Sequence, residues 1–392
     1  MSEPDPSPQP APPRRDVRIG FIPLTDCATV IMAALKGFDA RHGIRIVLSK
    51  QASWAAVRDK LIGGELDAAQ LLYGMASALQ LGIGGPREDM AVLMTLSRNG
   101  QAITLSRQLA MRGALDGPSL ARVMANAPRE YTFAQTFPTG THAMWLYYWL
   151  AAYGIDPLRD VRLITVPPPQ MVSGLNAGAM DGFCAGEPWN QRAIAAGAGV
   201  TIATSQQIWP DHPEKVLATT RGYVQRHPHA ARALVAALLE AARWIDASDA
   251  HRAETAAALA APQYLDTPPE MIAPRLLGHY ENGLGRQWTD PHPVRFHDGG
   301  RVNFPYLSDA IWFMTQQRRW GLLAQDPDYL AVAGALNQVA LYREAAAQVG
   351  VAVPDTPMRS SRLIDGVAWD GSEPAAYAAR FEIRAHRQRN PA

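Results

Sequence analysis

The sequence has few of the features that mark common enzymes or nucleic-acid-binding proteins. Its 392 residues include only two cysteines, Cys27 and Cys184, which lie far apart and lack the spacing of a zinc site or a disulfide framework. They are expected to be buried free thiols. The 37 basic and 36 acidic residues nearly balance, so no bulk charge favours nucleic acid or a membrane surface.

Catalytic signatures are also missing. The sequence contains no Walker lysine loop, no G-x-G-x-x-G after a strand, no H-E-x-x-H and no G-x-S-x-G. No clustered pair of carboxylates suits acid and base roles. The sequence therefore predicts a protein that is not an enzyme, with no catalytic residue, no metal ion and no cofactor.

The first residues bear on the cellular compartment. Residues 2–13 contain six prolines and no apolar run, so 1–16 is expected to be a disordered proline-rich leader. Paired arginines follow, but Arg18 and Asp26 interrupt the apolar stretch that an export signal needs, and Asp26 stands where a lipoprotein signal needs a small residue before Cys27. No apolar run approaches the roughly 20 residues of a membrane-spanning helix. We therefore expect a cytoplasmic protein.

The rest of the chain alternates between strand and helix patterns, which predicts an α/β fold. Its length exceeds what one core usually covers, so two lobes are expected, with a crossing near 113–119. The expected strands are 17–22, 44–48, 66–72, 92–96, 102–105, 131–134, 161–166, 180–185 and 200–203. The clearest expected helices are 29–42, 54–63, 141–153, 171–177, 228–247, 251–259 and 306–320, and those after 221 are expected to pack on the first lobe.

The segment 166–190 has the pattern of a ligand-binding edge. Three prolines end a strand, a helix follows, and a second strand ends on Gly186-Glu187-Pro188-Trp189. This arrangement places backbone N–H groups and a few polar side chains at the carboxyl edge of a parallel sheet, where α/β domains bind small ligands.

Single polar side chains also stand at expected strand ends and loop tips: Trp54, Gln101, His142 and Lys215. Such a set suits a small oxyanion, whose burial is costly unless hydrogen bonds and a positive charge replace its water. Each residue also has an ordinary alternative, namely packing for Trp54, solvent exposure for Gln101 and Lys215, and capping or core packing for His142. Spacing alone does not choose between these roles.

Several separated segments resemble the nitrate- and bicarbonate-binding receptors of ABC importers, the NrtA/CmpA-like substrate-binding proteins. The segments are GFIPLTDCA (20–28), ASW (52–54), GELDAA (64–69), NGQAIT (99–104), the edge 166–190, FPY (304–306), IWF (311–313) and RRWG (318–321). They occur in register, and the likeness covers nearly the whole chain after the leader, to about residue 383.

The resemblance implies a two-lobed, periplasmic-binding-protein-like fold of type II that closes on its ligand. Each lobe would hold a mixed, mostly parallel sheet flanked by helices. We expect lobe 1 to comprise 17–110 plus 222–386 and lobe 2 to comprise 111–221, with the ligand cleft between them.

The resemblance also implies the ligand, nitrate or nitrite. The matching positions are Trp54, Gln101, His142 and Lys215, with further lining from Ala185, Gly186 and Glu187. Glu187 is expected to orient donors, because its charge would repel an anion. Lys215 points to a nitrate-type receptor, since bicarbonate-binding relatives use calcium as the positive charge. A lone ammonium beside a monoanion would contribute about 4 kcal/mol at an effective dielectric near 20, before desolvation is subtracted.

Because no export signal is expected, the chain is more similar to cytoplasmic nitrate and nitrite sensors of the NasS type. The resemblance implies an ANTAR-type, NasT-like RNA-binding antiterminator as the partner, restrained until nitrate or nitrite releases it, and no direct contact with nucleic acid or membrane. Two alternatives stay open. One is an importer receptor whose start omits an export signal. The other is an enzyme like thiamine-pyrimidine synthases, although 183–185 does not reproduce their cysteine-rich segment.

Overall fold

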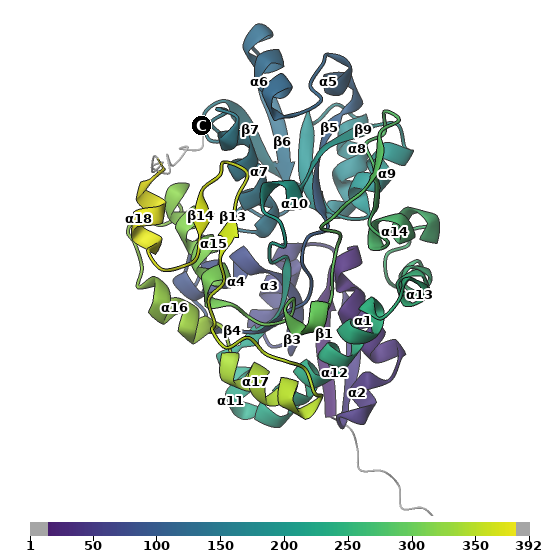
Figure 1. Ribbon diagram of the computed structural model, residues 1–392, viewed down its shortest axis with the longest axis vertical. Helices are drawn as coiled ribbons and strands as arrows, with labels where there is room; N and C mark the ends of the chain where they lie inside the picture. The colour runs from purple at the N-terminus through teal and green to yellow at the C-terminus, as the bar shows by residue number, and fades with distance from the viewer. Residues whose placement is uncertain (1–14, 382–392) are drawn as a thin grey trace, which may run out of the picture.

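The computed structural model describes residues 15–381 and shows two lobes, each built on a five-stranded sheet (Figure 1). Most of the expected leader, 1–14, lies outside the described residues. Its last two residues are not disordered, because Arg15 and Asp16 begin β1 (Arg15–Phe21) and pair with β2 (Ile44–Lys50). The Asp16 carboxylate accepts a 2.6 Å hydrogen bond from Arg45 Nε, which helps to extend this pairing.

The lower sheet in Figure 1 has the strand order β2-β1-β3-β10-β4. Strand β1 runs parallel to β2 and β3, whereas β10 runs antiparallel to β3 and β4. The remaining strands are β3 (Ala68–Leu72), β4 (Met90–Thr95) and β10 (Lys215–Thr220). They are fully or almost fully buried, as expected for strands covered by helices on both faces.

The upper sheet has the strand order β7-β6-β8-β5-β9. Its strands are β5 (Gln101–Ser106), β6 (Tyr131–Gln135), β7 (Val161–Thr165), β8 (Gly182–Gly186) and β9 (Gly199–Thr204). Strand β6 is parallel to β7 and β8, and β5 is antiparallel to β8 and β9. The expected α/β class, with mixed sheets in two lobes, is confirmed.

The chain changes lobes earlier than the sequence predicted. It leaves the lower sheet after β4 ends at Thr95 and enters the upper sheet at Gln101, then returns between Thr204 and Lys215. The expected boundaries after 110 and 221 therefore assigned β5 and β10 to the wrong lobes. A short apolar strand has the same residue pattern in either sheet, so the pattern does not reveal which sheet it joins.

Helices cover both sheets, and most expected helices are present with small shifts at their ends. The exception is 29–42, which forms α1 (Ala28–Leu35) and α2 (Phe38–Arg41) on either side of Gly37. Gly37 has a φ of 69°, a left-handed conformation that ends a helix. Within residues 15–381, no helix is both long enough and apolar enough to cross a membrane.

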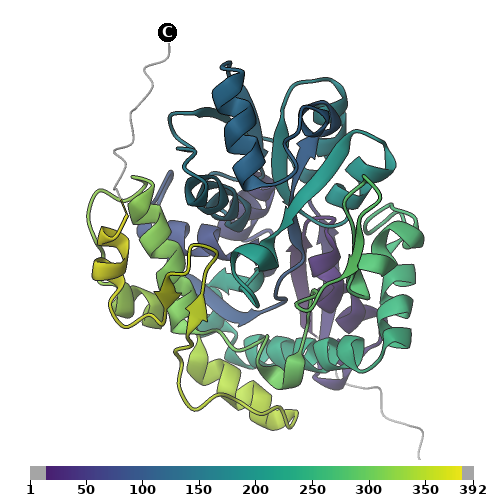
Figure 2. The same cartoon turned by 45° about the horizontal axis from the view of Figure 1, so that its top comes forward.

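The part of the chain after residue 227 packs on both lobes. Helices α12 (Pro228–Asp246) and α17 (Val339–Gln348) pack together under the lower sheet, beside α1. Helix α15 (Leu307–Arg319) contacts α4 (Tyr73–Leu81), and it also reaches α7 (Thr141–Ala152) of the other lobe. Figure 2 shows this yellow-green segment running beside both lobes, so the expectation that it packs on the first lobe is incomplete.

The remaining elements are shorter or lie at the periphery. The helices are α3 (Trp54–Ile62), α5 (Arg107–Met111), α6 (Gly117–Asn126), α8 (Met171–Asn176), α9 (Trp189–Ala195), α10 (Ser205–Ile208), α11 (Arg221–Arg226), α13 (Asp249–Leu259), α14 (Pro269–Leu276), α16 (Tyr329–Leu336) and α18 (Pro374–Ala379). Two hairpins pair β11 (His279–Glu281) with β12 (Gln287–Thr289) and β13 (Ser361–Arg362) with β14 (Ala368–Trp369). Short 3-10 turns cover Thr25–Cys27, Pro168–Gln170 and Asp298–Gly300.

Candidate functional site

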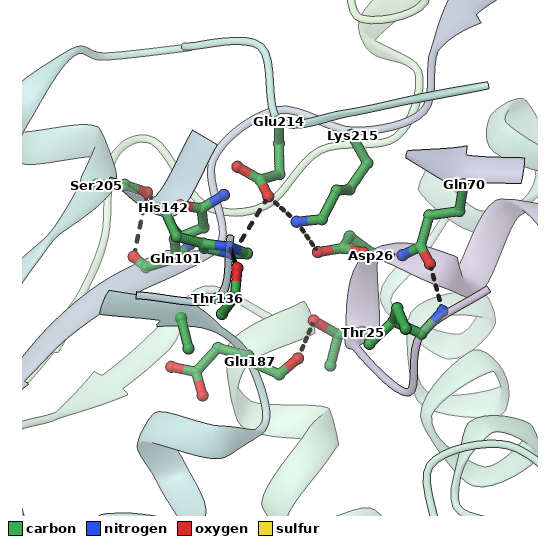
Figure 3. Close-up of polar contacts among 12 residues, drawn as sticks. Thr25, Asp26, Gln70, Gln101, Thr136, His142, Glu187, Ser205, Glu214 and Lys215 are labelled. Carbon is green, nitrogen blue, oxygen red and sulfur yellow. Dashed lines mark hydrogen bonds and ion pairs between the residues drawn. The ribbon is translucent and has the colours of Figure 1, made fainter. Parts of the chain in front are cut away.

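Four polar residues expected to bind a ligand lie at the starts of four different elements, where the lobes meet. Trp54 begins α3, Gln101 begins β5, His142 is the second residue of α7, and Lys215 begins β10. The side chains of Gln101, His142 and Lys215 point toward one another (Figure 3), and Lys215 Nζ lies 5.6 Å from the centre of the Trp54 ring. The structure thus brings together residues from both lobes.

All four side chains are buried. Trp54 is 1% exposed, and Gln101, His142 and Lys215 are 0% exposed. The alternative of ordinary solvent exposure for Gln101 and Lys215 is therefore wrong. A lysine and a glutamine are rarely buried so completely unless partners or a ligand compensate the loss of water.

Several buried polar atoms in this cluster have no hydrogen-bond partner. They are Nε1 of Trp54, both amide atoms of Gln101, Nε2 of His142 and Oε2 of Glu214. A buried polar atom without a partner typically costs about 1–3 kcal/mol, and most such atoms in proteins are satisfied. Unsatisfied atoms gathered at one place between two lobes are typical of a site that binds a small polar molecule.

Lys215 is held by two buried carboxylates, Asp26 and Glu214, which the sequence patterns do not single out. Its Nζ donates to Oδ2 of Asp26 at 2.9 Å and also to Oε1 of Glu214 (Figure 3). The other oxygen of Asp26 accepts a hydrogen bond from Nε2 of Gln70. Gln70 is fixed in turn, because its Oε1 accepts from the backbone N–H of Ile22 at 2.9 Å.

These carboxylates change the electrostatics of the site. The expected contribution of a lone ammonium does not apply, because two carboxylates lie against one positive charge. Burial and the nearby Asp26 raise the pKa of Glu214 to about 8, against the opposing effect of Lys215. Burial also raises the pKa of Asp26. Burial lowers the pKa of Lys215, but the two carboxylates outweigh this effect and raise it, so the ammonium stays charged.

His142 is positioned as a neutral donor. Its Nδ1 lies 2.5 Å from Oγ1 of Thr136, and its Nε2 lies 3.9 Å from Oε1 of Glu214. Burial, together with the nearby Lys215 and His212, holds the pKa of His142 well below its usual range. When the Thr136 hydroxyl donates to Nδ1, Nε2 carries the ring hydrogen and can donate it to a ligand.

The predicted lining residues Ala185 and Gly186 end β8 beside this cluster. Gly186 pairs with Gln101 in the sheet, and Ala185 pairs with Ala102. A Cβ atom on Gly186 would lie only 3.3 Å from Oδ2 of Asp26. Glycine at this position therefore allows the edge of one lobe to approach the carboxylate of the other.

The side chain of Glu187 pairs with Arg275 and does not join the cluster around Lys215. Its Oε1 accepts from Nε of Arg275 at 3.1 Å, its Oε2 accepts from the backbone N–H of Gln191, and the carboxylate points away from Lys215 and His142 (Figure 3). Its backbone oxygen accepts from the N–H of Thr25 at 2.8 Å. The carboxylate thus belongs to a buried ion pair, while the backbone ties this edge to the turn that carries Asp26.

The two lobes touch directly beside the cluster. A Cβ atom on Gly74, near the start of α4, would lie 2.4 Å from the backbone oxygen of Thr139. A Cβ atom on Gly140, just before α7, would lie 2.5 Å from Cδ1 of Leu72. The lobes are therefore in contact, and the polar cluster is enclosed between them.

Other chemistry is sparse in the part of the chain that the structure describes. Cys27 and Cys184 are buried free thiols, as expected. No group of three or more histidine, cysteine, aspartate or glutamate residues within 15–381 is arranged to hold a metal ion.

Comparisons with known proteins identify relatives along almost the whole chain. Residues 10–260 match the NMT1-like family. The nitrate/nitrite binding protein NrtA of Synechococcus elongatus is 37% identical over 393 residues, which cover 96% of this chain and 88% of that protein. The bicarbonate-binding protein CmpA of the same species is 33% identical over 94% of this chain and 87% of that protein.

Another relative is longer than this chain. The nitrate import ATP-binding protein NrtC of Synechocystis is 38% identical over 93% of this chain, but the match spans only 55% of that protein. The chain thus covers just over half the length of this relative.

Solved structures agree with the fold. The crystal structure of the periplasmic nitrate-binding protein NrtA from Synechocystis PCC 6803 has a TM-score of 0.90 at 34% identity, covering 95% of this chain and 100% of that chain. A zinc-bound ligand-binding component of an import system from Staphylococcus aureus has a TM-score of 0.67 at 17% identity, which shows the fold alone. The chain therefore belongs to the NMT1-like family, among the NrtA/CmpA-like nitrate and bicarbonate substrate-binding proteins.

Proposed function

We propose that this protein binds nitrate or nitrite between its lobes, with Trp54, Gln101, His142 and Lys215 donating to the anion. The observation that carries the proposal is that Trp54, Gln101 and His142 have buried polar atoms without partners beside the buried ammonium of Lys215. The names of the NrtA relatives, which are nitrate/nitrite binding proteins, support the choice of anion.

The donor set suits such a ligand chemically. Nitrate and nitrite are small planar anions whose oxygens only accept hydrogen bonds, and the indole, amide, imidazole and ammonium groups can all donate. Hydrogen bonds from these groups would replace the water that the anion loses on burial. We propose binding rather than catalysis, in line with the binding and import proteins found as relatives.

A ligand bound between the lobes would favour the arrangement in which they are in contact. Trp54 and Lys215 belong to elements of the lower lobe, whereas Gln101 and His142 belong to elements of the upper lobe. A ligand that touches both sets favours the arrangement in which the lobes are together, and its binding free energy shifts the population toward that arrangement.

We further propose that the chain acts in the cytoplasm as a sensor of the NasS type. In this role it would hold an ANTAR-type antiterminator when empty and release it when nitrate or nitrite binds. The resemblance to such sensors and the enclosure of the site support this role. The required coupling between ligand and partner is about 1–3 kcal/mol. The substrate-binding subunit of a nitrate or nitrite importer is the second candidate, and the similarity to NrtA supports it.

Two measurements test these proposals. Calorimetry with nitrate, nitrite and bicarbonate tests binding, and we expect a saturable exothermic signal with at least one of the first two anions. Gel filtration with a co-expressed antiterminator, with and without nitrate, tests the sensor role. An assembly that nitrate leaves intact would refute that role, and recovery of the protein from the periplasm would favour the importer.

A further inference from the structure

Only one of the two carboxyl oxygens of Glu214 has a hydrogen-bond partner. Its Oε1 accepts a hydrogen bond from Lys215, whereas its Oε2 is buried and has no partner. The second carboxylate of the cluster differs, because Gln70 donates to one oxygen of Asp26 and Lys215 donates to the other. Glu214 therefore has the one carboxylate oxygen of this pair that is free to carry a hydrogen atom.

The charge of the cluster requires such a hydrogen. One ammonium and two ionised carboxylates give a net charge of minus one, and all three side chains are buried. A monoanion entering an enclosed site of this charge would be repelled, because charges close together interact strongly away from water. A single proton on the pair would remove the net negative charge before the anion arrives.

We propose that Glu214 determines the specificity of this site by holding a proton on Oε2 and donating that hydrogen to the bound anion. This inference rests on the proposed binding of nitrate or nitrite. When the free protein has lost the proton, binding must take one up from solution, so affinity is linked to pH.

Several groups face Glu214 from both lobes. Lys215 and Asp26 lie in its ion-pair cluster, His142 faces it from α7, and Cys184 faces it from β8. The indole N–H of Trp145 also faces the carboxyl group and, as a donor, acts to lower its pKa, although Trp145 Nε1 and Glu214 Oε2 do not complete a hydrogen bond. Burial holds His142 neutral and raises the pKa of the Cys184 thiol well above its usual range. Of these neighbours, only Lys215 carries a positive charge, and Asp26 offsets it.

The protonated carboxyl group also discriminates between anions. With Oε2 as a donor, Glu214 matches nitrate and nitrite, which only accept hydrogen bonds. Bicarbonate carries a hydroxyl group that needs an acceptor, and an ionised Glu214 would supply one. The preference for nitrate over bicarbonate should therefore fall as Glu214 loses its proton, since leaving a buried polar group unpaired is the main source of such selectivity.

Calorimetry on the wild-type protein tests the proton directly. Nitrate is titrated in pairs of buffers that differ in ionisation enthalpy, which converts the difference in heat into protons taken up. We expect uptake near zero at about pH 6 and approaching about one proton per anion at about pH 9, with affinity falling up to about tenfold per pH unit in the upper range. Nitrate binding without proton uptake and with unchanged affinity across this range would overturn the inference and leave the proposed function intact.

The variant Glu214→Gln tests whether Glu214 is the residue involved. Its amide can donate a hydrogen bond but cannot ionise, so we expect it to bind nitrate with no proton uptake and no loss of affinity at high pH. Uptake equal to that of the wild type in this variant would assign the proton to another group and overturn the inference. Absence of nitrate and nitrite binding by the wild type at every pH would instead refute the proposed function.

Discussion

The Nζ atom of Lys215 lies 2.9 Å from Oδ2 of Asp26, although 189 residues separate the two in sequence. This contact joins the first residue of β10 to the 3-10 turn after β1, and Glu214 completes the cluster. Lys215 therefore enters the site as part of an ion-pair network and not as a free ammonium. A substitution of Lys215 therefore changes the stability of the protein as well as its ligand binding.

Replacing Lys215 by methionine should destabilise the fold as well as remove a ligand donor. The change leaves the Asp26 carboxylate buried without its cation, next to the carboxyl group of Glu214, and loss of one partner of a buried pair typically costs about 3–5 kcal/mol. Urea unfolding measures the change in stability. The matched control combines Lys215→Met with Asp26→Asn and Glu214→Gln, which removes the unpaired charges. Its stability should return close to that of the wild type, and a triple variant as unstable as the single one would contradict the account.

Gln101→Leu should stabilise the empty protein and weaken nitrate binding. The glutamine has two buried amide atoms without partners, so a leucine of similar size removes unsatisfied groups and gains about 1 kcal/mol or more. The same replacement at Gln70 is the matched control, because Gln70 is equally buried but bonded to Asp26 and Ile22. Thermal unfolding is measured with and without nitrate. Without nitrate, the unfolding temperature should rise for Gln101→Leu and fall for Gln70→Leu. If Gln101→Leu destabilised the protein as much as Gln70→Leu, the amide of Gln101 would stabilise the fold and would not be reserved for a ligand.

Gly74→Ala should hold the lobes apart. The added Cβ would lie 2.4 Å from the backbone oxygen of Thr139, and a backbone atom cannot move aside as a flexible side chain can. We expect nitrate affinity to fall at least tenfold and small-angle scattering to show a larger radius with nitrate present. Gly334→Ala is the control, since this glycine lies in α16 with open space around it, and it should be neutral or slightly stabilising. Wild-type affinity in Gly74→Ala would contradict the role of this lobe contact.

His212 should make the protein sensitive to mild acid. Burial lowers its pKa from 6.5 to about 3. Between these two pH values the histidine is protonated in the unfolded chain but neutral in the folded protein. Its contribution to stability is full above pH 6.5 and is lost as the pH falls, by about 1.4 kcal/mol per pH unit. The raised pKa of Glu214 acts in the opposite direction, because the folded protein binds that proton more tightly.

The comparison between variants isolates the histidine. Urea unfolding of the wild type and of His212→Asn is measured from about pH 7 to about pH 5. Relative to the wild type, the variant should gain stability steadily as the pH falls. A constant difference between the two proteins would show that His212 does not titrate on unfolding.

The sequence predicted which polar residues meet between the lobes but not the charge balance around them. Trp54, Gln101, His142 and Lys215 were identifiable because each stands at the start of an element, a position that local pattern reveals, and a resemblance linked them. Asp26 and Glu214 were missed because their partner contacts depend on how distant segments meet. A signal was present, since Asp26 interrupts an apolar stretch and Glu214 stands directly before the buried strand β10.

The same limit explains the errors in the fold. Apolar runs located the strands closely, but they did not show that β5 and β10 each join the opposite sheet from that expected. The break at Gly37 depends on a left-handed backbone conformation that glycine permits but does not require. The side chain of Glu187 could not be assigned either, because Arg275, its buried partner, is 88 residues away.

Titration calorimetry with nitrate and nitrite, near neutral pH, on the wild-type protein and the Gln101→Leu variant tests whether the protein binds these anions through Gln101. We expect saturable binding of at least one of these anions by the wild type, and loss of at least about 1.4 kcal/mol of binding free energy, or about tenfold in affinity, in the variant. Absence of binding of both anions by the folded wild type, or equal affinity in the variant, would contradict this expectation.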